Sequence, residues 1–176
     1  MSKSGRLDRF DQMVDTSLDH LRGNRLFDRL FYTASTLGDF SVIWYLSAVT
    51  RATGGETGRD EAVRLAVCLL AESLFINGLV KSLFRRSRPV HDGPRPHRLR
   101  TPRTSSFPSG HATSGFMAAT LLADGRPGQI PLWFGLAAIV ALSRAYVRIH
   151  HASDVVGGAI IGAAMGLLVV TFWPIG

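Results

Sequence analysis

Long apolar runs separated by short polar stretches fill the chain after residue 26. Residues 62–84 give the clearest run, because a helix that rises about 1.5 Å per residue crosses roughly 30 Å of hydrocarbon over this length. Residues 155–176 carry no charge at all. The pattern predicts an all-α, polytopic helical membrane bundle. We expect about five transmembrane helices, near residues 30–50, 62–84, 109–123, 130–147 and 154–174.

The N-terminal residues 1–25 follow a different pattern, in which apolar side chains recur at steps of three and four. Aspartates occupy other positions around the same helix, which makes it too charged to span a membrane. We therefore predict an amphipathic helix that ends at Gly23 and Asn24. It either packs on the rest of the domain or lies at a membrane interface, and both can hold. Residues 26–176 then form the transmembrane bundle of a single domain.

Polar stretches and glycines mark where the helices begin, end and meet. Residues 51–61, RATGGETGRDE, read as a polar glycine-rich loop, and Pro108 with Ser109 supplies helix start signals. Gly158, Gly162 and Gly166 recur every four residues, a spacing that lets membrane helices approach closely.

Composition adds a charge argument to this picture. The chain has 176 residues, a formal net charge of +7 and an isoelectric point near 10.7. An anionic partner is implied, which composition alone leaves open between nucleic acid, a phospholipid surface and a phosphorylated small molecule. The spanning segments argue against nucleic acid. Cys68 is the single cysteine, so intramolecular disulfides and cysteine-built metal sites are excluded.

The expected topology places three polar clusters at one end of the bundle. The first, KSLFRRSRP, spaces Lys81, Arg85 and Arg88 four and three residues apart, so a continuing helix would carry them on one face. Pro89 restrains Arg88 to an extended conformation. Grouped cations suit an anionic head group, and Arg88 can offer a bidentate contact to phosphate. The alternative is a basic juxtamembrane stretch that contacts lipid phosphates generally.

The second cluster, FPSGHATSG, brings a hydroxyl, unpaired backbone N–H groups and a proton carrier to a helix N-terminus. These come from Ser109, Gly110 and His111, and Gly110 lets the backbone approach a ligand closely. The alternative is an ordinary proline–serine helix start followed by an exposed His111.

The third cluster is SRAYVRIHHASD, which ends just before the last apolar run. His150 precedes Asp154 by four residues, so the carboxylate can orient the imidazole on a helical turn and stabilise its cationic form. Such a pair makes a nucleophile of the imidazole. The alternative is a histidine pair that caps a helix or binds a metal adventitiously, which Arg144 and Arg148 disfavour by repelling a cation.

Together the three clusters resemble the tripartite signature of the type 2 phosphatidic acid phosphatase (PAP2) superfamily. Every position of that signature is filled, in order, and the surrounding helices fit the membrane branch of the family. The matching residues are Lys81-x6-Arg88-Pro89, Pro108-Ser109-Gly110-His111 and Ser143-Arg144-x5-His150-x3-Asp154.

The resemblance implies a metal-independent phosphohydrolase that acts through a phosphohistidine and uses no cofactor. His150 would attack phosphorus and Asp154 would orient it and steady its positive charge. His111 would protonate the leaving group and then activate water. The phosphoryl oxygens would be held by the remaining signature residues, which are Lys81, Arg88, Ser109, Gly110 and Arg144.

Roles outside the signature stay open for Arg85, Arg148 and His151. Membrane members of the family commonly have one more crossing than we expect here, and losing it would put the N-terminus on the side of the site. Lysine and arginine counts favour a cytoplasmic site, whereas the family's bacterial members usually work on the outer face. The orientation therefore stays open.

We expect an integral-membrane lipid phosphate phosphatase, multi-pass in a bacterial cell membrane. Its substrate would be a phosphomonoester or diphosphate of a phosphatidate-type or polyprenyl lipid, and its other partners the membrane lipids. Two alternatives are a non-catalytic membrane protein that binds anionic lipids and a relative of the vanadate-dependent haloperoxidases. The complete set of His111, His150 and Asp154 argues against the first, and the apolar helices argue against the second. The sequence leaves the lipid, the number of its phosphates and the oligomeric state undetermined.

Overall fold

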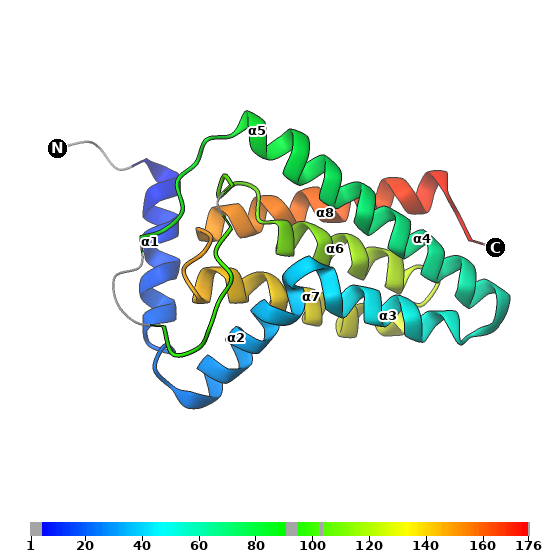
Figure 1. Ribbon diagram of the computed structural model, residues 1–176, viewed down its shortest axis with the longest axis horizontal. Helices are drawn as coiled ribbons and strands as arrows, with labels where there is room; N and C mark the ends of the chain where they lie inside the picture. Colours follow the sequence, from blue (N-terminus) through cyan, green and yellow to red (C-terminus); the bar gives the residue numbers. More distant parts are fainter. Residues whose placement is uncertain (1–4, 91–94, 103, 176) are drawn as a thin grey trace.

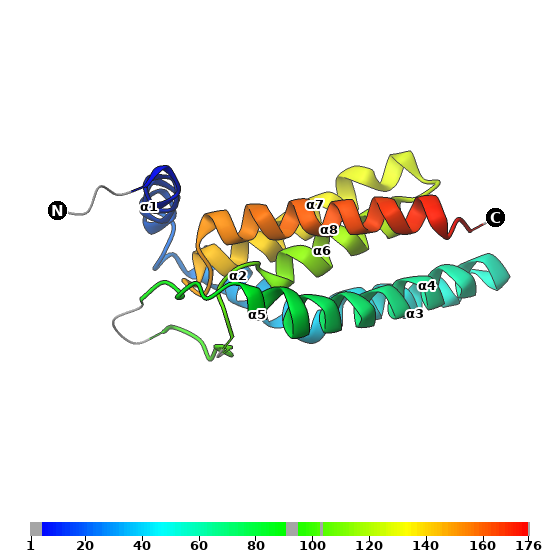
Figure 2. The ribbon, with the colours of Figure 1, turned by 90° about the horizontal axis from the view of Figure 1, so that it is seen from above.

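A bundle of long helices forms the body of the protein. The computed structural model describes residues 5–90, 95–102 and 104–175, and every regular element in these ranges is helical. The principal helices are α3 (Val42–Ala52), α4 (Gly55–Leu74), α6 (Gly110–Ala123), α7 (Ile130–Tyr146) and α8 (Ala152–Phe172). Helices α6, α7 and α8 run side by side, and α3 pairs with α4 on one side of them (Figure 1; Figure 2). The expected all-helical architecture is confirmed for the described residues.

Helix α8 lies directly against α6 because of its glycines. Gly158, Gly162 and Gly166 are all buried. A Cβ at Gly158 would lie 2.6 Å from the Ser109 carbonyl oxygen, and one at Gly162 would collide with the Thr113 carbonyl. The predicted close approach is therefore confirmed. It also fixes the N-termini of α6 and α8 beside each other, where two of the three polar clusters lie.

Helix α4 begins earlier than the sequence pattern predicts, at Gly55 rather than at residue 62. It continues through a π-helical turn, η2 (Phe75–Val80), into α5 (Lys81–Leu83). The polar loop expected at residues 51–61 is correspondingly short, since α4 begins at Gly55.

The helix stops at Leu83, and Phe84 adopts extended backbone angles. The continuing helix that would carry Lys81, Arg85 and Arg88 on one face therefore does not form beyond Leu83. The chain instead leaves the helix axis ahead of Pro89, and Arg88 turns back toward the third cluster.

The first expected crossing, residues 30–50, is broken into two helices. α2 (Arg25–Gly38) and α3 are separated by the short turn η1 (Asp39–Ser41), in which Phe40 and Ser41 have positive φ angles of 53° and 59°. Helix α2 runs obliquely to the bundle (Figure 1). The break matters for the site, because it brings the C-terminal end of α2 against the start of α6.

Three helices of the described residues are long and apolar enough to cross a membrane. They are Gly55–Leu83, Pro127–Tyr146 and Ala152–Phe172. Large apolar side chains cover their outward faces, among them Leu70 and Leu74 on α4 and Ile160 and Leu167 on α8. Apolar surface of this extent favours a lipid environment over water. These helices indicate a membrane protein.

Helix α1 (Arg6–Asp19) lies across one end of the bundle, roughly perpendicular to the long helices (Figure 1; Figure 2). It ends earlier than expected, since Asn24 does not close α1 but caps α2 by accepting a hydrogen bond from the Leu26 N–H at 2.9 Å. Arg148 binds two carboxylates of α1, those of Asp15 and Asp19. The helix thus packs on the bundle, at the end that holds the polar clusters.

Candidate active site

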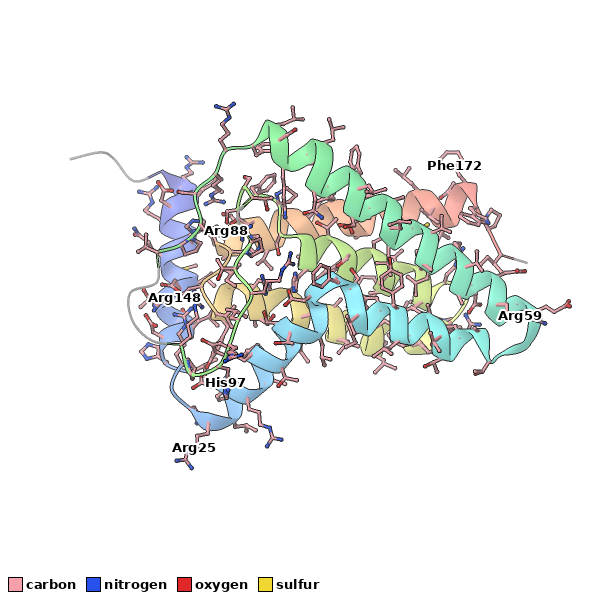
Figure 3. The ribbon with its side chains drawn as sticks, in the orientation of Figure 1. Arg25, Arg59, Arg88, His97, Arg148 and Phe172 are labelled. Atoms are coloured by element: carbon pink, nitrogen blue, oxygen red, sulfur yellow. The ribbon has the colours of Figure 1, made fainter. Side chains whose placement is uncertain are left out.

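The three polar clusters meet at the end of the bundle covered by α1. Arg88 and Arg148 both lie at this end, whereas Arg59 and Phe172 lie at the other (Figure 3). The Ser109 N–H donates to the Asp154 carbonyl oxygen at 3.1 Å, and the Gly110 backbone approaches the Lys81 ammonium so closely that a Cβ there would lie 3.7 Å from it. The prediction that segments distant in sequence assemble one polar site is confirmed.

Arg88 fixes the protonation pattern of His150. One guanidinium nitrogen of Arg88 lies 3.2 Å from His150 Nε2 and donates to the Ile149 carbonyl at 3.0 Å. The other terminal nitrogen donates to the Ser105 carbonyl at 3.1 Å. Because a guanidinium has no lone pair to offer, Nε2 must accept and the neutral imidazole must carry its proton on Nδ1. Nε2 therefore holds the lone pair that a nucleophile needs.

His150 is almost fully buried, with 3% of its surface exposed. Burial is the main cause that lowers its pKa to about 3, and the charges of Arg144 and Arg88 act in the same direction. The neighbouring Asp154 carboxylate opposes them and is outweighed. At neutral pH the imidazole is consequently uncharged, which is the form able to attack phosphorus.

Asp154 is enclosed by hydrogen-bond donors. Its Oδ2 accepts from the Ser106 hydroxyl at 2.6 Å and from the His151 N–H at 2.9 Å, and its Oδ1 accepts from Arg86 at 2.6 Å. His150 Nδ1 lies 3.7 Å from Oδ2, close enough for electrostatic stabilisation and longer than a hydrogen bond. The carboxylate is thus held beside the imidazole by a fixed set of partners.

His111 is oriented by Ser35 and Asp39, two residues to which the sequence patterns gave no role. Its Nε2 lies 3.0 Å from the Ser35 carbonyl oxygen and 3.3 Å from Asp39 Oδ1. Both partners only accept, so Nε2 carries a proton and Nδ1 is the nitrogen left to exchange one. A Cβ at Gly38 would lie 2.5 Å from the His111 ring, so only glycine permits this packing. The alternative, an ordinary helix start followed by an exposed His111, does not hold, because the side chain is only 13% exposed.

Several donors of the site are buried without partners among the described residues. They are the Ser109 hydroxyl and the Nε and Nη2 atoms of Arg144. The third guanidinium nitrogen of Arg144 donates to the Ser35 hydroxyl. Lys81 is buried as well, and its ammonium donates to the Asn77 side chain at 3.0 Å. Buried donors in native proteins are nearly always paired, so this set is suited to an anion with several oxygen atoms.

The residues left open by the sequence take different places. Arg85 is exposed. Arg148 binds Asp15 and Asp19 on α1, and these partners raise its pKa above its ordinary value. His151 is the N-cap residue of α8, and its Nε2 lies 3.2 Å from the Ser87 carbonyl oxygen. Arg148 therefore does not take the place of Arg144 in the site, and His151 does not take the place of His150.

Three further residues of the site escaped the sequence patterns, namely Asp39, Arg86 and Ser106. Asp39 gave a weak signal as a lone acid inside an apolar run, and Arg86 sits unremarked between the signature positions Lys81 and Arg88. Ser106 gave none. Each owes its position to loop or turn conformation, which residue spacing does not specify.

Comparisons with known proteins find matches over most of the chain. A family model described as the PAP2 superfamily matches residues 61–175. Decaprenylphosphoryl-5-phosphoribose phosphatase of Mycobacterium tuberculosis is 36% identical over 136 residues, which cover 77% of this chain and 74% of that protein.

Solved structures share the fold. The crystal structure of Aquifex aeolicus LpxE matches with a TM-score of 0.72 at 23% identity, covering 93% of this chain and 94% of that chain. A transmembrane PAP2-type phosphatidylglycerolphosphate phosphatase from Bacillus subtilis matches with a TM-score of 0.69 at 22% identity, covering 92% of this chain and 83% of the other.

Proposed function

This chain belongs to the PAP2 superfamily, and we propose that it is a membrane lipid phosphatase that removes phosphate through a phosphohistidine on His150. The observation that carries the proposal is the buried, unpartnered donor set of Arg144 and Ser109 beside the imidazole. With Lys81, Arg88 and the Gly110 backbone it can surround a phosphoryl group. Charge develops on the phosphoryl oxygens during transfer, where such prearranged donors are most effective.

In the first step, the lone pair on His150 Nε2 attacks phosphorus. The N–P bond forms as the bond from phosphorus to the leaving oxygen breaks, and His111 delivers its proton to that oxygen. Asp154 stabilises the positive charge that the imidazole acquires. Arg88 must release Nε2 at this point, and its guanidinium then donates to a phosphoryl oxygen instead.

In the second step, His111 takes a proton from water, and the oxygen of that water attacks phosphorus. The N–P bond breaks and inorganic phosphate leaves. Asp39 supports both steps, because its carboxylate favours the protonated form of His111 that the first step needs and the second step regenerates.

The bundle supports a site at the membrane surface. A lipid tail can stay in the bilayer while its phosphate enters the polar end, so the substrate is a phosphorylated lipid. We propose that the protein crosses the bacterial cell membrane about five times, with residues 30–50, bent at η1, and residues 109–123 as the two shorter crossings. In this arrangement α1 is an amphipathic helix that lies at the membrane interface, on the side of the site. Residues 1–176 form one domain.

The phosphatase is favoured over the two alternatives. The curated relatives at 30% identity or more are named as phosphatases, whereas a vanadium-dependent iodoperoxidase shares only the fold, at 15% identity. A protein that only binds anionic lipids would also not need two histidines that each lie beside a carboxylate, as His111 and His150 do here.

The proposal is tested by the release of inorganic phosphate from phosphorylated lipids by the protein in detergent or liposomes. We expect turnover of at least one of phosphatidic acid, phosphatidylglycerol phosphate and a polyprenyl phosphate or diphosphate, and equal turnover with EDTA present. Activity lost to EDTA and restored by a metal would overturn the metal-free mechanism. Full activity in His150→Ala would overturn the assignment of the nucleophile.

A further inference from the structure

A buried carboxyl group lies next to the site and takes no part in the mechanism above. Glu72, on α4, is 2% exposed, and its Oε1 is buried without a hydrogen-bond partner among the described residues. It lines a cavity of about 510 Å³ that Gly110 and His111 also line. A buried polar group without a partner costs free energy, so its place in this cavity points to a ligand.

The rest of the cavity lining identifies the chemistry of that ligand. Ser73, Asn77 and Ser114 contribute groups that both donate and accept hydrogen bonds, while Leu69 and Leu70 supply apolar surface. Lys81 and Arg100 lie close by, and their charges disfavour an ammonium group. His111, which protonates the leaving oxygen, opens onto the same cavity. The cavity is therefore on the side of the leaving alcohol.

We propose that Glu72 accepts a hydrogen bond from a free hydroxyl group of the leaving alcohol, so that the enzyme prefers lipids whose phosphate sits on a glycerol or sugar unit. A leaving group made only of hydrocarbon and esters would leave Glu72 unpaired. This inference rests on the proposed phosphatase activity and names the substrate class that the same site takes.

Two lipids with identical acyl chains separate the possibilities. Phosphatidylglycerol phosphate releases an alcohol with a free hydroxyl group, and phosphatidic acid releases one without. We expect the wild type to favour the first lipid in kcat/KM by about tenfold or more, and Glu72→Leu to remove most of that preference while changing the value for phosphatidic acid less than about twofold. Glu56→Leu is the matched control, because Glu56 lies in the first turn of the same helix and is exposed.

Every other result contradicts either the role given to Glu72 or the proposed function. An equal fall for both lipids would show that Glu72 acts through Lys81 and would overturn the proposal, as would an unchanged ratio. If Glu72→Leu fails to fold, the wild-type ratio decides, since equal use of both lipids contradicts the proposal. A wild type that hydrolyses no phosphorylated lipid would instead contradict the proposed function itself.

A separate set of contacts ties α1 to the carboxylate beside the nucleophile. Asp11, on α1, is 7% exposed, and its two oxygens accept from the Ser153 N–H and hydroxyl, both at 2.8 Å. Arg86 donates to Asp11 Oδ2 at 2.6 Å through one terminal nitrogen and to Asp154 Oδ1 at 2.6 Å through the other. One guanidinium thus shares its charge between Asp11 and Asp154.

The geometry assigns Asp11 as a positioning residue that acts through Arg86 on Asp154. Without the charge of Asp11, Arg86 pairs with Asp154 alone and neutralises more of its carboxylate. Asp154 then stabilises the developing charge on His150 less well. The phosphoryl oxygens are held by other residues, so substrate binding is unaffected and only turnover slows.

Asp11→Asn tests this assignment, because it keeps the shape of the side chain and removes the charge. We expect kcat to fall about tenfold with KM changed less than about twofold. The matched control is Asp15→Asn, which breaks ion pairs from the same helix to Arg148 and Arg22 without touching Arg86. Both variants lower thermal stability. If kcat per folded protein is then the same in both, Asp11 is merely structural and the assignment is wrong.

Discussion

The Arg88 guanidinium lies 3.2 Å from His150 Nε2 and holds the imidazole with its lone pair on that nitrogen. The same guanidinium donates to the carbonyl groups of Thr104 and Ser105, so the loop that precedes α6 supports it. Because the loop, Arg88 and His150 are connected by these contacts, the imidazole can be held in its reactive form before the substrate binds.

Replacing Arg88 by lysine should lower the catalytic activity more than the stability of the protein. Lysine keeps the charge, but its single nitrogen cannot replace the planar guanidinium fork that reaches the supporting carbonyl groups and a phosphoryl oxygen together. We expect kcat/KM for a phosphorylated lipid to fall about 10- to 100-fold. Arg85→Lys, at an exposed neighbouring position, should retain wild-type activity. Equal activity in the two variants would contradict the role given to Arg88.

Asp39→Asn tests the support of His111. The substitution removes the charge that favours protonated His111, so the first step loses its acid. A lipid phosphate with an alkyl leaving group should be hydrolysed about tenfold or more slowly, whereas p-nitrophenyl phosphate, whose leaving group needs no proton, should be affected far less. Steady-state rates with both substrates measure the difference. A uniform loss would assign Asp39 to another task.

Stability should depend on the protonation of His150 in acid. Its pKa is about 3 in the folded protein against an ordinary value of 6.5. Above pH 6.5 neither state binds the proton, and no difference arises. As the pH falls from about 6.5 toward 3, only the unfolded chain binds it, so stability is lost by up to about 1.4 kcal/mol per pH unit.

Thermal denaturation in detergent at several pH values measures this loss. His150→Asn should lose less stability than the wild type between pH 7 and 4, since asparagine does not titrate. His20→Asn, at an exposed position on the surface, should keep the wild-type dependence. Identical pH profiles for the wild type and His150→Asn would refute the assignment.

Gly162→Ala should disrupt the contact between α6 and α8. The added Cβ collides with the Thr113 carbonyl, so one helix must shift and carry Ser109 or Asp154 with it. We expect a loss of about 1–3 kcal/mol in stability together with lower activity. Gly135→Ala, on α7, is the control, because nothing lies within 4 Å of its added Cβ. It should be neutral or slightly stabilising. Similar melting temperatures for both variants would contradict the packing account.

The sequence sufficed to predict helices and to identify which ends of them meet. Spacing selected His150 over His151, and the glycine series on α8 predicted its approach to α6. Asp39 and Arg86 could not be found in this way. The first depends on the break at Phe40 and Ser41, where residues other than glycine adopt positive φ angles, and the second depends on the extended course of the chain after Leu83. Neither conformation follows from hydrophobic periodicity.

The central claim is a covalent phosphohistidine on His150, and trapping that intermediate tests it most directly. The wild type, His150→Ala and His151→Ala would each be mixed with a phosphorylated lipid that carries radiolabelled phosphate, and then quenched in alkali, in which phosphohistidine survives. We predict label on the wild type and on His151→Ala, and none on folded His150→Ala. Label that persists in His150→Ala, or a wild type that turns over without ever carrying label, would contradict the account.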